Sequence, residues 1–296
     1  MSVKVLVQSA RAPFLILAPV CVFLGFSTAR AAGAHIDGFS LLLCVVGALL
    51  AHISVNAFNE YFDFKSGLDA STDKTPFSGG SGALPAYPAM AHAVLKLAVV
   101  SLALTILIGV FFVWKSGWAI VPIGVIGVLL IVAYTETVTR HPYVCLIAPG
   151  LGFGFLMVLG VHVVLAGSFS TLVWLVALVP FFLVNNLLLL NQFPDRHADA
   201  KVGRRHFLVV FGPEISAKMY GLFVLATVMT IVLGVGFGRF PMWSLMALLP
   251  VPLALFSLSG AFRFGDQIGS QTPYLAANVV VSLLTPVLLG VSFILA

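Results

Sequence analysis

Charged side chains are the scarcest feature of this sequence. Lysine, arginine, aspartate and glutamate together make up only 8% of the 296 residues, whereas 60% are hydrophobic, and the mean hydropathy is +1.12. Soluble globular domains carry about 25% charged residues, so the composition excludes that class. Apolar runs of about 18 or more residues are typical of membrane helices. The sequence therefore predicts an all-α protein that crosses the lipid bilayer several times.

Cysteine is also scarce. The three cysteines, Cys21, Cys44 and Cys145, all lie in apolar stretches, and an odd number at such positions argues against a disulfide framework or a zinc site. The formal net charge of +5 would suit nucleic acid. Basic residues also hold loops on the cytoplasmic side of a membrane, and this explanation fits the apolar composition better, so we expect no nucleic-acid partner.

Nine apolar stretches have the length of a membrane span. A signal peptide is the alternative for the first, but its apolar run is long for one. Spans 1–4 and 5–8 are expected to form two parallel four-helix halves, with a ninth helix after them, in a single domain over residues 1–296. The predicted spans are Ala12–Ala29, Phe39–Phe58, Val94–Trp114, Trp118–Tyr134, Tyr143–Leu165, Thr171–Leu190, Met219–Phe237, Trp243–Ala261 and Tyr274–Ala296.

The basic residues orient these spans. With the N-terminus in the cytoplasm, only Arg30, Lys115 and Arg239 of the 15 lysines and arginines fall on the far side. The positive-inside rule therefore favours this orientation, in the inner (plasma) membrane of a cell. Of the 10 acidic residues, only Asp37 falls on the far side. Acidic residues do not follow that rule, so their one-sided distribution indicates a cytoplasmic site.

The first of two acidic loops spans about residues 56–91. Asn56, Asn59 and Asp63 share one helical face there, and Asp69 and Asp73 follow beyond Ser66-Gly67, which breaks the helix. Ordinary loop polarity is the alternative explanation. However, the polar face begins inside the predicted span, where polar groups are costly and usually functional.

The second acidic loop, about residues 185–218, repeats the pattern. Asn191, Asp195 and Asp199 are spaced i, i+4 and i+8 and would share one face of a helix. Two carboxylate clusters that face each other repel unless cations bridge them. Carboxylate and amide oxygens, together with water and phosphate oxygens, are what Mg²⁺ accepts. The two loops therefore predict a divalent-cation site.

At these residues the chain resembles a known family. N-E-Y-F-D-F-K-S-G-L-D, residues 59–69, is similar to the first aspartate-rich motif of the UbiA superfamily of intramembrane prenyltransferases, in the form found in its menaquinone-pathway branch. N-Q-F-P-D-R-H-A-D-A-K-V-G-R-R, residues 191–205, resembles the second motif, N-N-x-R-D-x-x-x-D-x-x-x-G-K. Either motif alone is a weak signal, whereas the pair, on cytoplasmic loops of a nine-span protein, is specific.

The resemblance implies a bundle of the UbiA type and a reaction. That reaction is Mg²⁺-dependent transfer of a polyprenyl group from an allylic diphosphate to an aromatic acceptor such as 1,4-dihydroxy-2-naphthoate, with 4-hydroxybenzoate or homogentisate as alternatives. The implied catalytic residues are Asp63, Asp195, Asp199 and Tyr134. The implied metal ligands are Asn59, Asp63, Asp69, Asp73, Asn191, Asp195 and Asp199. The implied substrate contacts are Asn59, Asn191, Lys65, Arg140, Lys201, Arg204 and Arg205.

The sequence departs from the family pattern at three places. Pro194 stands where the family often has arginine, Gln192 replaces the second asparagine, and the S-G-G-S-G segment lacks the Arg-Pro found in many members. Lys201, Arg196 or Arg205 would have to hold the diphosphate instead.

Two other classes of function remain open. A transporter would carry acids along an ion path between repeated halves, although here the acids gather on one side of the membrane. A family member that has lost catalysis and acts in binding or assembly is the third possibility. The presence of Asp63, Asp195 and Asp199 argues against it.

Overall fold

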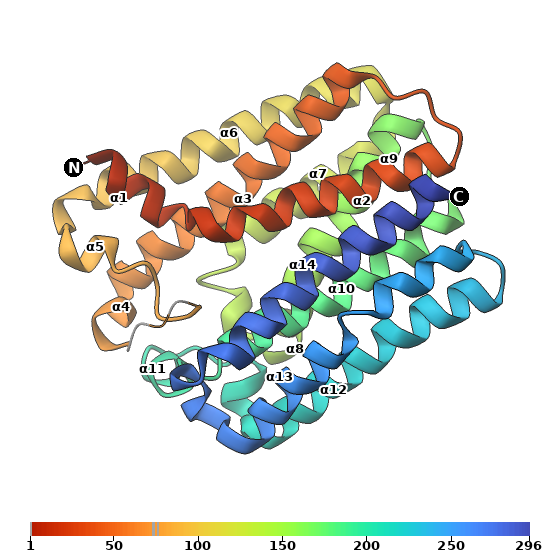
Figure 1. Ribbon diagram of the computed structural model, residues 1–296. Helices are drawn as coiled ribbons and strands as arrows, with labels where there is room; N and C mark the ends of the chain where they lie inside the picture. The colour runs from red at the N-terminus through yellow and green to blue at the C-terminus, as the bar shows by residue number, and fades with distance from the viewer. Residues whose placement is uncertain (1, 73–74, 76) are drawn as a thin grey trace.

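The computed structural model describes residues 2–72, 75 and 77–296, and every regular element in these ranges is a helix (Figure 1). The elements of the first half are α1 (Ser2–Ser9), η1 (Ala12–Ile16), α2 (Leu17–Ala31), α3 (Gly38–Ser66), α4 (Leu68–Ser71), α5 (Ala83–Ala86), η2 (Pro88–Met90), α6 (Ala91–Ser116), η3 (Trp118–Ile120), α7 (Val121–Ala133) and η4 (Val138–Arg140).

The second half also consists of long helices joined by short turns. Its elements are α8 (Pro142–Gly150), η5 (Leu151–Met157), α9 (Val158–Ala166), α10 (Thr171–Asn191), α11 (Arg196–Lys201), α12 (Phe207–Gly236), η6 (Met242–Leu248), α13 (Val251–Phe264), η7 (Gly265–Ser270) and α14 (Thr272–Leu295).

Within the described ranges, eight helical segments are long and apolar enough to cross a membrane, and Trp118–Ala133 is a shorter apolar helix. Each of the nine predicted spans coincides with one of these segments, so the prediction of an all-α polytopic membrane protein is confirmed. The ends differ most at α12, which begins at Phe207 instead of Met219. At the other large difference, α3 runs to Ser66 instead of Phe58. Its polar residues continue the helix until Gly67 adopts a left-handed conformation with φ of 78°, which favours glycine.

Several spans depart from a regular α-helix. Gly212 interrupts α12 with φ of 79° and ψ of 173°, and the helix resumes at Pro213, as expected for proline in a first helical turn. The span Pro142–Ala166 consists of α8, the π-helical segment η5 and α9. Such π-helical segments are rare and occur frequently at functional sites.

Helix packing is similar in the two halves. α3 packs extensively on α6, and α10 packs extensively on α12, so the second and third long helices of each half are neighbours. α14 contacts α2, α10, α13 and η6 and thereby joins the two halves. Figure 1 shows α1, α4, α5 and α11 at one end of the bundle, on the left of the view, with the C-terminus at the opposite end.

Candidate functional site

The first motif lies on the end of α3 and the turn that follows it. Asn59 and Asp63 are on the last turns of α3, and Asp63 is buried. The left-handed Gly67 reverses the chain, so that α4 returns Asp69 toward the same region, where its side chain is also buried. The predicted ligand Asp73 lies outside the described residues.

The second motif does not form one continuous helix. α10 ends at Asn191, Asp195 lies in the following turn, and α11 carries Asp199. Pro194 has no backbone N–H to continue the helical ladder, which explains the break. The predicted i, i+4, i+8 face is therefore replaced by a helix–turn–helix arrangement that still directs all three side chains to one cavity.

Arg204 connects the two motifs. Its guanidinium donates to Asp63 of the first motif and, at 2.8 Å, to Asp199 of the second. Nε2 of the buried His206 lies 2.9 Å from the other carboxylate oxygen of Asp199. Segments about 140 residues apart in the sequence therefore meet at one cation.

The glycine-rich segment Ser78–Gly82 is a second connection between the motifs. The backbone N–H of Gly79 donates to Asp195 Oδ2 at 3.0 Å. The backbone N–H of Ser81 donates to Glu60 at 3.2 Å, and the Ser81 hydroxyl donates to the same carboxylate. Asp69 lies against Gly80, where a Cβ atom would collide with its carboxylate. This segment therefore needs glycine to pass between the carboxylates of both halves.

A cavity of about 760 Å³ opens at this meeting point. One end is lined by Asp63, Asp69, Asp195, Asp199 and two arginines, Arg11 and Arg204. The rest is lined mainly by apolar side chains of α3, α6, α7, η5 and α9. An acidic end that continues into an apolar chamber suits a ligand with a metal-binding anionic head and a hydrocarbon chain.

Burial disfavours the charged form of two carboxylates at the acidic end. Burial raises the pKa of Asp69 to about 7, and the neighbouring Glu60 and Asp63 add to the effect. Burial and the nearby Asp199 likewise raise the pKa of Asp195 to about 7, although the Gly79 N–H opposes this. When the pKa of a carboxylate is raised in this way, a positive charge that binds beside it stabilises its charged form.

Four oxygen atoms at this end are buried without a hydrogen-bond partner. They are Asn59 Oδ1, Asp69 Oδ2, Asn191 Oδ1 and Asp195 Oδ1, and each residue lines the cavity. Each motif provides two of them, and buried polar atoms normally have a partner. Hard oxygen ligands that lack partners fit a divalent cation such as Mg²⁺.

No three His, Cys, Asp or Glu side chains within the described ranges are close enough to form a metal site by themselves. This agrees with the donor set above, in which half of the unpartnered oxygens belong to asparagine amides. Mg²⁺ also keeps several waters and commonly takes the remaining ligands from substrate phosphates. If Mg²⁺ binds here, these oxygens would provide part of its coordination sphere and leave positions for a ligand.

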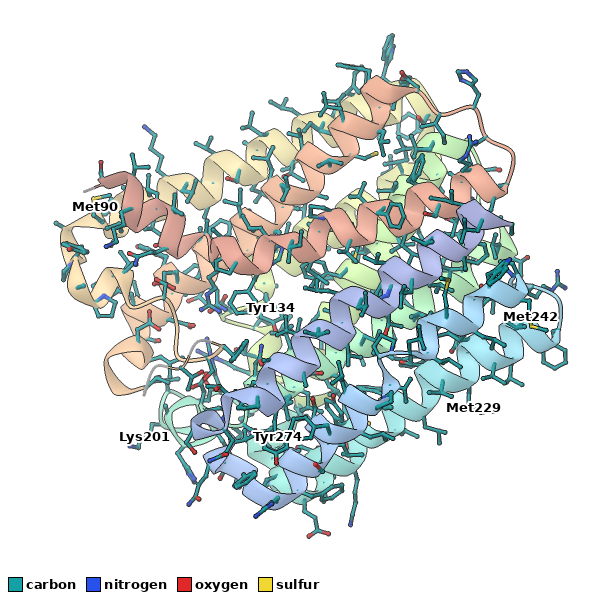
Figure 2. The ribbon with its side chains drawn as sticks, viewed as in Figure 1. Met90, Tyr134, Lys201, Met229, Met242 and Tyr274 are labelled. Atoms are coloured by element: carbon teal, nitrogen blue, oxygen red, sulfur yellow. The ribbon has the colours of Figure 1, made fainter. Side chains whose placement is uncertain are left out.

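The other predicted site residues divide into two groups. Tyr134 lines the cavity, and Figure 2 shows it near the middle of the bundle, with Lys201 at the outer edge of the motif end. Lys65, Arg140, Lys201 and Arg205 are exposed and do not line the cavity. Arg196, considered as a substitute for the missing arginine, pairs with Asp266 at 3.0 Å. The structure therefore brings Arg204, and not these cations, into the cavity.

Two charged residues at the site were not singled out from the sequence as site residues. Glu60 is fully buried, and Arg11, attributed to membrane topology, lines the cavity. A possible signal for Glu60 was its position beside Asn59, within the last turns of an apolar helix. No local pattern distinguishes Arg11, because the side chains that hold its turn, Asn56 and Glu60, lie on α3, far along the sequence.

Comparison with known proteins agrees with this geometry. The UbiA prenyltransferase family matches residues 17–289. The chain is 26% identical over 229 residues to the 1,4-dihydroxy-2-naphthoate octaprenyltransferase of Bacillus subtilis (strain 168), with coverage of 76% of this chain and 72% of the relative.

Two solved structures show the same fold. A UbiA homolog from Aeropyrum pernix K1 in its apo form has a TM-score of 0.74 at 14% identity, covering 96% of this chain and 98% of the homolog. A UbiA homolog from Archaeoglobus fulgidus bound to DMAPP and Mg²⁺ has a TM-score of 0.63 at 14% identity, covering 98% and 99%.

Proposed function

This chain belongs to the UbiA prenyltransferase family, and we propose that it transfers a polyprenyl group from an allylic diphosphate to an aromatic quinone precursor. One observation carries the proposal. The two motifs meet at the acidic end of a cavity whose remaining walls are apolar. A diphosphate fits the acidic end if a divalent cation is present, and an isoprenoid chain fits the apolar part.

The metal would be Mg²⁺, held by Asn59, Asp63 and Asp69 on one side and by Asn191, Asp195 and Asp199 on the other, with Asp73 as a further proposed ligand. A cation held by these residues would neutralise negative charge on the leaving diphosphate. Mg²⁺ together with DMAPP in the Archaeoglobus fulgidus homolog supports this assignment.

The chain's own residues hold the reactants and exclude water. Arg204 fixes Asp63 and Asp199 relative to each other and offers its charge to the diphosphate. When the allylic C–O bond breaks, the diphosphate leaves with the electron pair, and the apolar walls keep the allylic cation from water. An electron-rich ring carbon forms the new C–C bond, and the ring then loses a proton or CO₂. We place Tyr134 beside the reacting carbon because it lines the same cavity.

We propose 1,4-dihydroxy-2-naphthoate as the acceptor, which would place the enzyme in lipid-quinone biosynthesis. The name of the Bacillus subtilis relative supports this choice. 4-Hydroxybenzoate and homogentisate are the alternatives. The exposed Lys65, Arg140, Lys201 and Arg205 would attract anionic substrates toward the site. The charge distribution of the sequence supports an inner-membrane location with both motif loops in the cytoplasm.

The proposal is tested by diphosphate release from purified protein in detergent, with Mg²⁺ or with EDTA. The donor is a mixture of allylic diphosphates, and mass spectrometry identifies the product formed from a panel of aromatic acceptors. We expect a prenylated naphthalene that forms only when the metal is present. No diphosphate release from any donor by folded protein would contradict the proposal, and uptake of a solute into vesicles would instead support a transporter.

A further inference from the structure

Arg11 lies at an unusual point of the backbone, between α1 and η1. Its φ of 52° and ψ of 53° are left-handed, and it is the one non-glycine residue with positive φ in the described ranges. Non-glycine residues rarely adopt this conformation, and when they do, the surrounding structure holds them there, often at functional sites. The conformation therefore raises the question of what holds Arg11 and why.

Two side chains of α3 hold this turn. Asn56 Nδ2 donates to the backbone carbonyl of Ala10 at 3.0 Å, which fixes the residue directly before Arg11. The fully buried Glu60, one turn further along α3, has its carboxylate 3.9 Å from the Arg11 guanidinium. Ser81 donates two hydrogen bonds to Glu60, so the carboxylate itself is fixed by the glycine-rich segment.

The guanidinium of Arg11 is not fully used by these contacts. Its side chain is 25% exposed, and its Nε is buried without a hydrogen-bond partner. Arg204, by comparison, is engaged by both Asp63 and Asp199. Arg11 and Arg204 are the two Lys/Arg residues that line the cavity in the described part of the chain. Arg11 is therefore the cation there with donors available for a ligand.

Arg11 shares the acidic end of the cavity with carboxylates of both motifs. Asp63 and Asp69 of the first motif and Asp195 and Asp199 of the second line this end together with Arg11. An anion held between the two motifs would therefore lie in the same end of the cavity as the Arg11 side chain.

We propose that Arg11 binds anionic oxygens of a substrate in this cavity and that Asn56 and Glu60 position it to do so. This inference rests on the proposed function. Two sources of such oxygens fit the same chemistry, the diphosphate of the prenyl donor and the carboxylate of the aromatic acceptor. A guanidinium suits either, because its planar fork donates two parallel hydrogen bonds.

The test measures binding to purified protein in detergent by titration calorimetry, with two separate probes in the presence of Mg²⁺. The probes are inorganic pyrophosphate and 1,4-dihydroxy-2-naphthoate. We expect Arg11→Gln to weaken the binding of one probe about 10- to 100-fold, as for loss of a hydrogen bond to a charged group. Weaker pyrophosphate binding assigns Arg11 to the donor, and weaker naphthoate binding assigns it to the acceptor.

Three further variants make the test specific. Arg11→Lys keeps the charge without the fork and should recover part of the affinity. Arg11→Gly accepts the left-handed backbone, so it should fold as the wild type does while binding as Arg11→Gln does. Arg30→Gln removes an exposed arginine outside the cavity and should bind both probes normally. Equal loss in Arg30→Gln and Arg11→Gln would contradict the inference.

Failure of the inference and failure of the proposed function give different results. If the wild type binds the probes and Arg11→Gly binds them equally well, Arg11 has no role in binding and the prenyltransferase proposal stands. If the wild type binds neither probe and releases no diphosphate from allylic donors, both proposals are wrong. Glu60→Gln provides an independent comparison, because loss of the positioning carboxylate should weaken the same probe by a smaller factor.

Discussion

Arg204 illustrates how much of this site depends on a single residue. It provides the positive charge between Asp63 and Asp199, and both carboxylates are buried. Removing one partner of a buried ion pair costs about 3–5 kcal/mol, because the remaining charges stay buried without compensation. We expect Arg204→Ala to lower the thermal unfolding temperature of the metal-free protein and to abolish product formation.

Divalent cations provide the check on this prediction. If Mg²⁺ binds between the same carboxylates, it should recover part of the stability lost in Arg204→Ala, and EDTA should reverse the recovery. Thermal unfolding in detergent, followed with and without Mg²⁺, measures both effects. Arg30→Ala, at an exposed position, is the matched control and should unfold as the wild type does. An unchanged unfolding temperature in Arg204→Ala would contradict the prediction.

The carboxylates Asp63 and Asp195 allow a second test at the residue scale. Asparagine has nearly the same shape as aspartate but no charge, so Asp63→Asn and Asp195→Asn should still fold. Each should slow metal-dependent diphosphate release by at least about 100-fold, equivalent to roughly 3 kcal/mol. The control is Asp37→Asn at the start of α3, where the side chain caps the helix and asparagine caps equally well. Near-normal release from both site variants would contradict the assignment of these carboxylates.

Individual residues also show where prediction from sequence ends. The motif spacing predicted that Asn59, Asp63, Asn191, Asp195 and Asp199 act together, and the structure places all five on one cavity. The motif spacing could not predict the contact between Arg11 and Glu60, because that contact depends on how the N-terminal turn packs on α3. Side-chain contacts between distant segments follow from tertiary packing, which local patterns do not record.

At the scale of elements, hydropathy predicted where helices lie but not how they are built. The apolar run Tyr143–Leu165 predicts one regular helix, whereas the observed span Pro142–Ala166 contains the π-helix η5. An apolar run gives no local sign of a change in hydrogen-bond register. Its glycines are the informative residues, because Gly150 and Gly154 pack directly against the backbone of α10. We infer that close contact with α10 stabilises this irregular segment.

Gly154 tests this inference. A Cβ atom there would lie 2.7 Å from the Cα of Phe181 and 2.8 Å from the carbonyl oxygen of Ala177, both on α10. Backbone cannot move aside as a flexible side chain can, so Gly154→Ala should destabilise the protein by about 1–3 kcal/mol, as overpacking does. Gly236→Ala on α12 has no atom within 4 Å of the added methyl group and should be neutral or slightly stabilising. Thermal unfolding of both variants measures the difference.

At the scale of the whole molecule, the two motif loops lie at one end of the bundle (Figure 1). This arrangement follows from parity, because the loops are four spans apart and must face the same side of the membrane. The excess of basic residues at this end predicts that the side is the cytoplasm. For the proposed function, the orientation would determine which side of the membrane supplies the acceptor, since residues of both motif loops line the acidic end of the cavity.

Single cysteines at exposed positions report this orientation directly. The three native cysteines are buried, so background labelling should be low. Lys65→Cys and Lys218→Cys lie at the motif end, and Arg239→Cys lies beyond α12 at the other end. In intact cells, a membrane-impermeant maleimide should label only Arg239→Cys. In inverted vesicles it should label Lys65→Cys and Lys218→Cys and not Arg239→Cys.

The reverse pattern would place both motifs, and with them the proposed diphosphate site, outside the cytoplasm. Labelling of Lys65→Cys and Lys218→Cys from opposite sides would contradict the shared face on which the site depends.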